Sequence, residues 1–244
     1  MIRIEICTSN YKSVCNAQDG GADCAELCSA LEVGGITPPY GVLAEVAHVM
    51  RIPVRVLIRP RSGNYIYDDR EVEMMCRDIE KVAMLGYEGV VIGALNDEGD
   101  IDVKAVKSMM RAGKGMKFTF HRAVDASRDI FESFRQLAEL GFDKVLTSGG
   151  CPDAPRGASV IAELQKRYGD KMKIMPGGGI NISNVESLLR ATGVSDCHAS
   201  LTENVTCFHK SLYPDGVDAT GASMVWKESD LNKIKMFVQL CRKL

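Results

Sequence analysis

The feature that most constrains the fold of this chain is a regular alternation between short strand-like runs and longer stretches with helical periodicity. The 244 residues contain eight such runs, each followed by a segment long enough for one helix. In chain order they are "IRIEIC", "CAELC", "VRVLIR", "GVVIG", "MKFTFH", "KVLTS", "KIMPG" and "DCHAS". Short β-forming runs that alternate with helical patterns are typical of βα units in a parallel sheet.

The intervening stretches carry apolar residues three or four positions apart, which predicts helices with one buried face. Examples are Val72, Met75, Ile79 and Val82, and Ile130, Phe134 and Leu137. Glycines that would end such helices are Gly86, Gly113, Gly141, Gly169 and Gly193. Ser183 and Glu186 have the spacing of a capping box at a helix start.

No linker or charge block interrupts the alternation, so we expect residues 1–244 to form a single domain. Eight consecutive βα units in a chain of this length predict an α/β fold, a closed (β/α)8 TIM barrel. A doubly wound open sheet is the alternative.

Charge and hydropathy point to a small-molecule partner. With 30 basic and 32 acidic residues, the net charge of −2 gives no reason to expect nucleic acid. No segment is apolar enough to span a membrane, and the N-terminal residues lack the pattern of a secretion signal, so we expect a cytoplasmic protein. Its nine cysteines are then expected to be reduced thiols.

Alternation along each strand predicts which side chains point into the barrel, because the other face must pack on helices. If Ile4 and Ile6 face the helices, Glu5 and Cys7 face inward. The same rule turns the following residues inward: Cys24, Glu26, Cys28, Arg59, Thr119, His121, His198 and Ser200.

These inward side chains should converge on the C-terminal mouth, where barrel enzymes carry their chemistry. In an enzyme, Glu26 and His121 would be the acid/base pair, while Glu5 and His198 would position them or complete a hard-metal site. Each also has a structural interpretation: a buried Glu could pair with Arg55 or Arg59, and a His could simply line the barrel.

The run "KIMPGGGINISN" ends a strand in three glycines, Gly177, Gly178 and Gly179, whose backbone N–H groups suit an anion. Arg59 could bind an anionic group from the same mouth, with Ser200 beside it. The partner would be a small anionic molecule, phosphorylated or sugar-like. The glycines could equally form only a tight turn.

Several stretches resemble the CutC family of copper homeostasis proteins. They are "GADCAELCSALEVGGITPPYG", "LIRPRSGNYIYDDREVEMMCRDI", "FTFHRAVD", "VLTSGG", "IMPGGGIN" and "CHAS". The resemblance implies a cytoplasmic TIM barrel, often a homo-oligomer, that takes part in copper tolerance or trafficking and is proposed to bind Cu(I). The suggested metal ligands of the family fall on Cys7 and Cys28.

Elementary chemistry is compatible with that implication. Soft thiolates favour Cu(I), and neighbouring strands lie about 4.8 Å apart, close enough for two sulfurs at matching strand ends to share one ion. Cys7 and Cys28 could instead be buried filler. A structural zinc site is less compatible, since no C-x-x-C pair is present.

Overall fold

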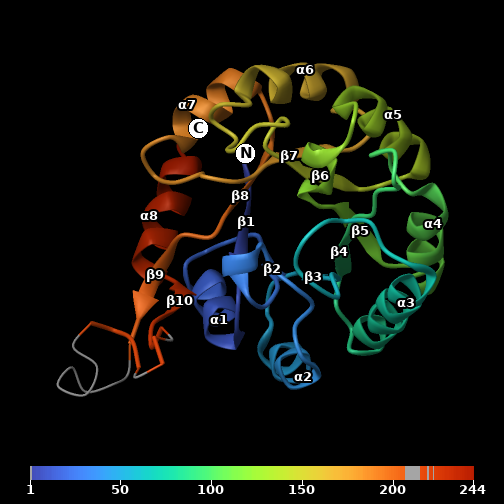
Figure 1. The fold of residues 1–244 in the computed structure, drawn as a ribbon. Helices are drawn as coiled ribbons and strands as arrows, with labels where there is room; N and C mark the ends of the chain where they lie inside the picture. Colours follow the sequence, from blue (N-terminus) through green and yellow to red (C-terminus); the bar gives the residue numbers. More distant parts are fainter. Residues whose placement is uncertain (1, 207–214, 219, 222) are drawn as a thin grey trace.

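The computed structural model describes residues 2–206, 215–218, 220–221 and 223–244, in which eight parallel strands form a ring surrounded by helices (Figure 1). Their hydrogen-bonded order is β7-β6-β5-β4-β3-β2-β1-β8, and β7 contacts β8 to complete the ring. The strands are β1 (Arg3–Thr8), β2 (Cys24–Leu27), β3 (Val54–Leu57), β4 (Gly89–Ile92), β5 (Lys117–Phe120), β6 (Lys144–Thr147), β7 (Lys173–Pro176) and β8 (Asp196–Ala199). The predicted (β/α)8 barrel is thus confirmed, and the doubly wound sheet is excluded.

Helices cover the outside of this ring (Figure 1). They are α1 (Tyr11–Asp19), α2 (Tyr40–Val49), α3 (Asp69–Met84), α4 (Val103–Ala112), α5 (Ile130–Leu140), α6 (Ala158–Tyr168), α7 (Val185–Thr192) and α8 (Leu231–Cys241), with 3-10 turns η1 (Leu31–Val33) and η2 (Arg122–Ala126). Among the residues described, no helix combines the length and apolar character needed to cross a bilayer.

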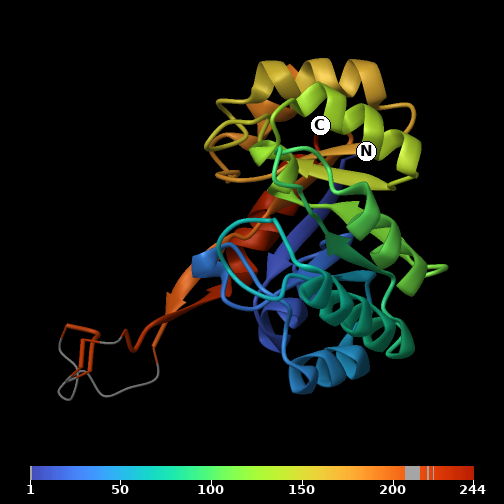
Figure 2. The ribbon, with the colours of Figure 1, turned by 45° about the vertical axis from the view of Figure 1, so that its right-hand side comes forward.

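The last βα unit departs from the predicted alternation. Between β8 and α8 the chain forms an antiparallel hairpin of β9 (Thr202–Val205) and β10 (Trp226–Ser229). Figure 2 shows this hairpin leading away from the barrel. Its strands pair with each other and not with the barrel sheet, so the barrel keeps eight strands.

Helix ends follow local chemistry, with one correction. Glycines close α4, α5, α6 and α7 as predicted, and Gly86 follows α3. The capping box predicted at Ser183 is wrong: α7 begins after Asn184, and Ser183 donates both its N–H and its hydroxyl to the Asn181 side chain. The structure has its capping box on α3 instead, formed by Asp68 and Glu71.

Two apolar clusters lie on opposite sides of the strands, as side-chain alternation requires. Ile4, Ile6 and Leu27 belong to the large cluster that packs against the helices. A small cluster inside the barrel contains Cys7, Cys28, Leu57 and Val91. Buried side chains outside both clusters include the apolar Leu146 and Met175 and the polar or charged Glu5, Glu26, Arg55, Thr119, Lys144, Asp196 and His198. Most of the apolar stabilisation therefore comes from the outer cluster, which leaves the interior free to carry polar groups.

Candidate functional site

A cavity of about 630 Å³ lies at the C-terminal mouth of the barrel. Most of the predicted site residues line it: Cys7, Glu26, Cys28, Arg59, His121, Gly178, Gly179, His198 and Ser200. The two exceptions are Glu5, which lies beneath the cavity and contacts it through His198, and Gly177. The predicted convergence of side chains from distant strands is therefore confirmed in position, although their roles stay predictions.

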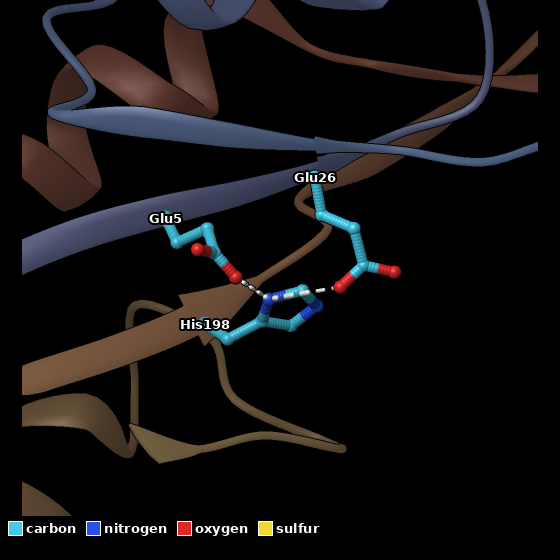
Figure 3. A group of neighbouring side chains, drawn as sticks. All are labelled: Glu5, Glu26 and His198. Carbon is cyan, nitrogen blue, oxygen red and sulfur yellow. Dashed lines mark hydrogen bonds and ion pairs between the residues drawn. The ribbon is translucent and has the colours of Figure 1, made fainter. Parts of the chain in front are cut away.

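Three neighbouring strands bring together Glu5, Glu26 and His198 (Figure 3). Strand β1 pairs with both β2 and β8, and its register places Glu5 directly opposite His198. The His198 Nδ1 lies 2.9 Å from Glu5 Oε1 and 3.8 Å from Glu26 Oε2, so the imidazole sits between the two carboxylates. One ligand atom from each of the three lies within 4.8 Å of the others, a spacing that could hold a metal ion.

A buried lysine that the sequence analysis missed balances these charges. Lys144 Nζ lies 3.3 Å from Glu5 Oε2 and 3.2 Å from Asp196 Oδ1. Arg55, one of the partners considered for a buried Glu, pairs with Glu88 instead. Side-chain alternation could have predicted that Lys144 and its partner Asp196 point inward. Asp196 has the parity of His198, and Lys144 is followed by Val145, which faces the helices.

The resulting charge distribution sets the protonation of the cluster. Burial opposes the charge on Glu5, but Lys144 and then His198 outweigh it and lower its pKa. Burial also opposes charge on His198, but Cys7, Glu5 and Glu26 raise its pKa well above the ordinary value. The carboxylates of Glu5 and Asp196 are thus balanced by the cations of Lys144 and His198 inside the barrel.

Glu26 is the surplus carboxylate of this interior. Its side chain is buried, and Oε2 has no hydrogen-bond partner among the described residues. Burial raises the pKa of Glu26 to about 7, with His198 opposing the shift and Glu5 adding to it. A carboxyl group that changes protonation near neutrality is suited to general acid/base chemistry.

The two proposed metal ligands lie side by side at the mouth. Cys7 Sγ and Cys28 Sγ are 4.0 Å apart, and both side chains are buried. The neighbouring Cys28 thiol and burial together raise the pKa of Cys7 well above the ordinary value. Cys24 lies deeper, with its Sγ 3.5 Å from Glu5 Oε2, and is not part of this pair.

Among the described residues no hydrogen bond or ion pair joins His121 to Glu26, and His198 lies beside Glu26 instead. The acid/base pair of Glu26 and His121 stays a prediction. Ala123 N–H donates to His121 Nδ1 at 3.1 Å, so His121 caps η2. Burial, and then the nearby Arg59 charge, lower the pKa of His121 to about 3. His121 is therefore a neutral imidazole whose Nε2, buried and without a partner in the described structure, carries the proton.

Arg59 is largely engaged by the loops around it. Its Nη1 donates to the carbonyls of Val33 and Gly35, its Nη2 donates to the carbonyl of Gly63, and the guanidinium stacks 5.0 Å from the centre of the Tyr65 ring. Only Nε lacks a partner among the described atoms. The arginine therefore organises the mouth loops more than it offers a free fork to an anion.

A second arginine, missed by the sequence analysis, stands at the glycine loop. A Cβ added at Gly178 would lie 3.0 Å from Arg122 Nη1, so the absence of a side chain lets the guanidinium approach the backbone. Arg122 lies directly after His121 in "FTFHRAVD" and lines the same cavity. Because Arg122 directly follows a strand end whose His121 was expected to point into the mouth, the sequence could have suggested Arg122 as a further residue of the cavity.

Comparison with known proteins places the chain in a family. The sequence profile of the CutC family matches residues 2–203. The chain belongs to the CutC family. A CutC protein of Xanthomonas campestris pv. campestris is 38% identical over 237 residues, which cover 97% of this chain and 98% of the relative. A CutC protein of Pasteurella multocida is 41% identical over 199 residues, 82% of each chain.

Solved structures agree with this assignment. The CutC structure from Streptococcus agalactiae has 33% identity and a TM-score of 0.78, and the match covers 82% of this chain and 99% of that one. Phosphoribosyl anthranilate isomerase from Thermococcus kodakaraensis shares only 18% identity at a TM-score of 0.62, a likeness of fold alone. The CutC profile thus spans all eight barrel strands and ends within the hairpin.

Proposed function

We propose that this CutC protein binds Cu(I) between Cys7 and Cys28 and contributes to copper homeostasis. The observation that carries the proposal is the 4.0 Å separation of two buried sulfurs at the edge of a cavity. The name of the Streptococcus agalactiae relative also refers to copper homeostasis.

The geometry and the chemistry of the pair suit a soft monovalent ion. A metal–sulfur bond of about 2.3 Å implies about 4.6 Å between two opposed sulfurs, so only a small side-chain movement is needed. Thiolates are the ligands that favour Cu(I). Two thiolates and one Cu(I) carry one net negative charge, and protonated His198, which interacts with Cys7, would offset it.

Two accompanying expectations are part of this proposal. The cysteines that the structure describes are all free thiols, as expected in a reducing compartment such as the cytoplasm. A homo-oligomer, implied by the family resemblance, can be checked by light scattering of the purified protein. A monomer at micromolar concentration would refute that part alone.

Anaerobic Cu(I) titration against a competing chelator tests the copper site. We expect one tightly bound ion in the wild type, with affinity at least tenfold lower in Cys7→Ser and Cys28→Ser. Cys24→Ser is the matched control, because it removes a buried thiol outside the pair. Equal affinity in all four proteins would exclude Cys7 and Cys28 as ligands.

A second candidate function is acid/base catalysis on a small anionic substrate. The specific observation behind it is Glu26, whose buried carboxyl group has a pKa of about 7 and an unpartnered oxygen beside His198. Glu26 would abstract or return a proton, while His198, held by Glu5, would stabilise the negative charge that develops.

Exchange of substrate carbon-bound hydrogen in D₂O tests this candidate without a known product. We expect the metal-free wild type to catalyse exchange in at least one member of a panel of phosphorylated aldoses and ketoses, as followed by proton NMR. Glu26→Gln should abolish the exchange, and Cys28→Ser should retain it. Exchange that persists in Glu26→Gln would assign the chemistry elsewhere, and no exchange across the panel would refute the candidate.

A further inference from the structure

We propose that the mouth cavity binds a small phosphorylated polyol, with its phosphate against Arg122, Gly178 and Gly179 and its hydroxylated chain against His121 and Glu26. The proposal rests on the second candidate function for any turnover, but the binding itself requires neither copper nor catalysis. It starts from a difference between two sets of residues that line one cavity. Glu26, His198 and Cys7 enter the cavity from the neighbouring strands β2, β8 and β1, whereas Arg122 follows β5 and the glycine loop follows β7.

Arg122 is held in place by four of its neighbours and still has a free donor. Its Nε donates to Asp125 Oδ2 at 3.0 Å, and Nη2 donates to Ser148 Oγ at 2.7 Å, with longer contacts of 3.4 Å to the carbonyls of Cys151 and Pro152. Nη1 makes no hydrogen bond with any residue in the described ranges. A guanidinium fixed on one edge and free on the other is preorganised for an oxyanion.

The glycine loop adds backbone donors next to that free edge. Gly178 and Gly179 have φ of +95° and +72°, conformations that favour glycine. Their N–H groups donate to no atom in the part of the chain that the structure describes, and both residues line the cavity. Successive free N–H groups in a concave backbone form a recognised kind of anion site.

Two carboxylates lie near this loop: Asp125, whose oxygens are already engaged, and Asp153, which packs against Gly179 and pairs with Arg156 at 3.3 Å. Asp125 accepts hydrogen bonds from Thr147 Oγ1 at 2.5 Å and Ser148 Oγ at 2.9 Å, and from the N–H groups of Ser148 and Gly150. It also pairs with Arg122, so the local charge is close to balanced. Phosphate recognition would therefore depend on directed donors, which disfavours halide ions relative to a tetrahedral oxyanion.

Two further residues of the cavity lining, His121 and Glu26, carry an unsatisfied donor and an unsatisfied acceptor. His121 Nε2–H and Glu26 Oε2 are both buried without hydrogen-bond partners among the described residues, and both side chains line the cavity. Leaving such groups unpaired costs about 1–3 kcal/mol each. Both atoms are almost fully covered, so a ligand pairs with them only if the two side chains turn toward the cavity. Hydroxyl groups donate and accept, so a polyol chain would then satisfy both atoms, whereas an apolar chain would satisfy neither.

The size of the cavity matches such a ligand. Its volume of about 630 Å³ lies within the usual range of small-molecule sites, about 300–1,000 Å³. A phosphate at one end and hydroxyl groups at the other would use both sets of residues at once. Free phosphate or an uncharged sugar would each use only one.

Calorimetric titration of the metal-free protein with ribose 5-phosphate, ribose and inorganic phosphate tests the proposal. We expect ribose 5-phosphate to bind at least tenfold more tightly than either fragment. Arg122→Gln should weaken ribose 5-phosphate and inorganic phosphate alike by at least tenfold, and Arg122→Lys should restore part of the loss. Glu26→Gln should weaken ribose 5-phosphate and leave inorganic phosphate unchanged. Arg128→Gln, which removes an exposed arginine paired with Asp100, is the control.

Unchanged binding in Arg122→Gln, in a variant whose circular dichroism spectrum is unaltered, would overturn the proposal. So would equal affinity for ribose 5-phosphate and inorganic phosphate, since the hydroxylated chain would then contribute nothing. Binding as expected without hydrogen exchange in D₂O would support this proposal and remove only the catalytic candidate. Absence of ribose 5-phosphate binding by the wild type, with intact Cu(I) affinity, would overturn this proposal and leave the copper site standing.

Discussion

Replacement of Lys144 by Met tests whether the interior of the barrel depends on one buried cation. Lys144 Nζ lies within 3.3 Å of Glu5 and 3.2 Å of Asp196, and the three side chains are 5%, 1% and 4% exposed. Met has a similar length and fills the space, so the main effect is to remove the cation shared by two buried carboxylates, of which Glu5 keeps the charged partner His198.

Removal of one member of a buried ion pair costs about 3–5 kcal/mol, because the remaining charge stays desolvated. For a chain of this size, each 1 kcal/mol shifts the unfolding midpoint by about 2–4 °C, so we expect Lys144→Met to melt about 6–20 °C lower. Thermal unfolding followed by circular dichroism at pH 7 measures this shift. Lys104→Met is the matched control, because Lys104 forms a solvent-exposed pair with Asp69 at 3.0 Å, and its loss should leave the melting temperature nearly unchanged.

The dependence on pH gives a second readout of the same cluster. Lys144 is the largest of the effects that lower the pKa of Glu5 in the folded protein, against the opposing effect of burial. A lowered folded-state pKa means that Glu5 stabilises the fold above its unfolded pKa of about 4.3 and that this contribution is lost as the pH falls. Lys144→Met should therefore lose less stability between pH 7 and pH 4 than the wild type does. Equal melting temperatures for Lys144→Met and the wild type would refute the reasoning, as would a Lys144→Met/Glu5→Gln double variant no more stable than Lys144→Met.

Three further predictions concern the mouth. The neighbouring Cys28 thiol and burial raise the pKa of Cys7, so Cu(I) must displace protons when it binds. We therefore expect the Cu(I) affinity, measured by chelator competition, to rise from pH 6 to pH 8, and an affinity independent of pH would argue against thiolate ligands. Burial raises the pKa of Glu26 to about 7, so ionisation of Glu26 destabilises the fold as the pH rises from 4 to 8. Glu26→Gln should therefore become more stable than the wild type by up to about 3 kcal/mol over this range, and chemical denaturation at pH 4 and pH 8 that showed no such difference would contradict the prediction. Gly93→Ala would place a Cβ 2.4 Å from His121 Cε1 and should destabilise the protein by about 1–3 kcal/mol. Gly41→Ala, in open space on α2, is the control, and equal melting temperatures for the two variants would contradict the close packing around His121.

The sequence was sufficient to predict the barrel because its periodicity is repeated eight times. Each helical stripe and each strand end is specified by local residues, as in α5, where Asp129 caps the first turn and Gly141 closes the last with φ of +82°. Local signals failed where side chains compete. Asn181 Oδ1 accepts from the Ser183 N–H, the donor that Glu186 would have taken in a capping box, and it also holds the Ser183 hydroxyl; no spacing rule reports that competition.

The candidate site was predictable as a set of residues but not as a set of contacts. Alternation turned Glu5, Glu26 and His198 toward one interior, since parity follows from the strand period alone. Which imidazole meets Glu26 depends on register and barrel closure, and the structure gives His198 and not His121.

The sequence by itself determined the number of barrel strands, the apolar outer face and the inward parity of Glu5, Glu26 and His198, because these follow from short-range periodicity and from the need to bury apolar surface. Only the tertiary structure decided how the interior charges pair, that Lys144 neutralises Glu5 and Asp196, and that Glu26 is left as the surplus carboxylate. It also decided that Arg59 is engaged by loop carbonyls while Arg122 faces Gly178. Charges interact through space across strands that lie far apart in the chain, so their partners are set only when the ring closes.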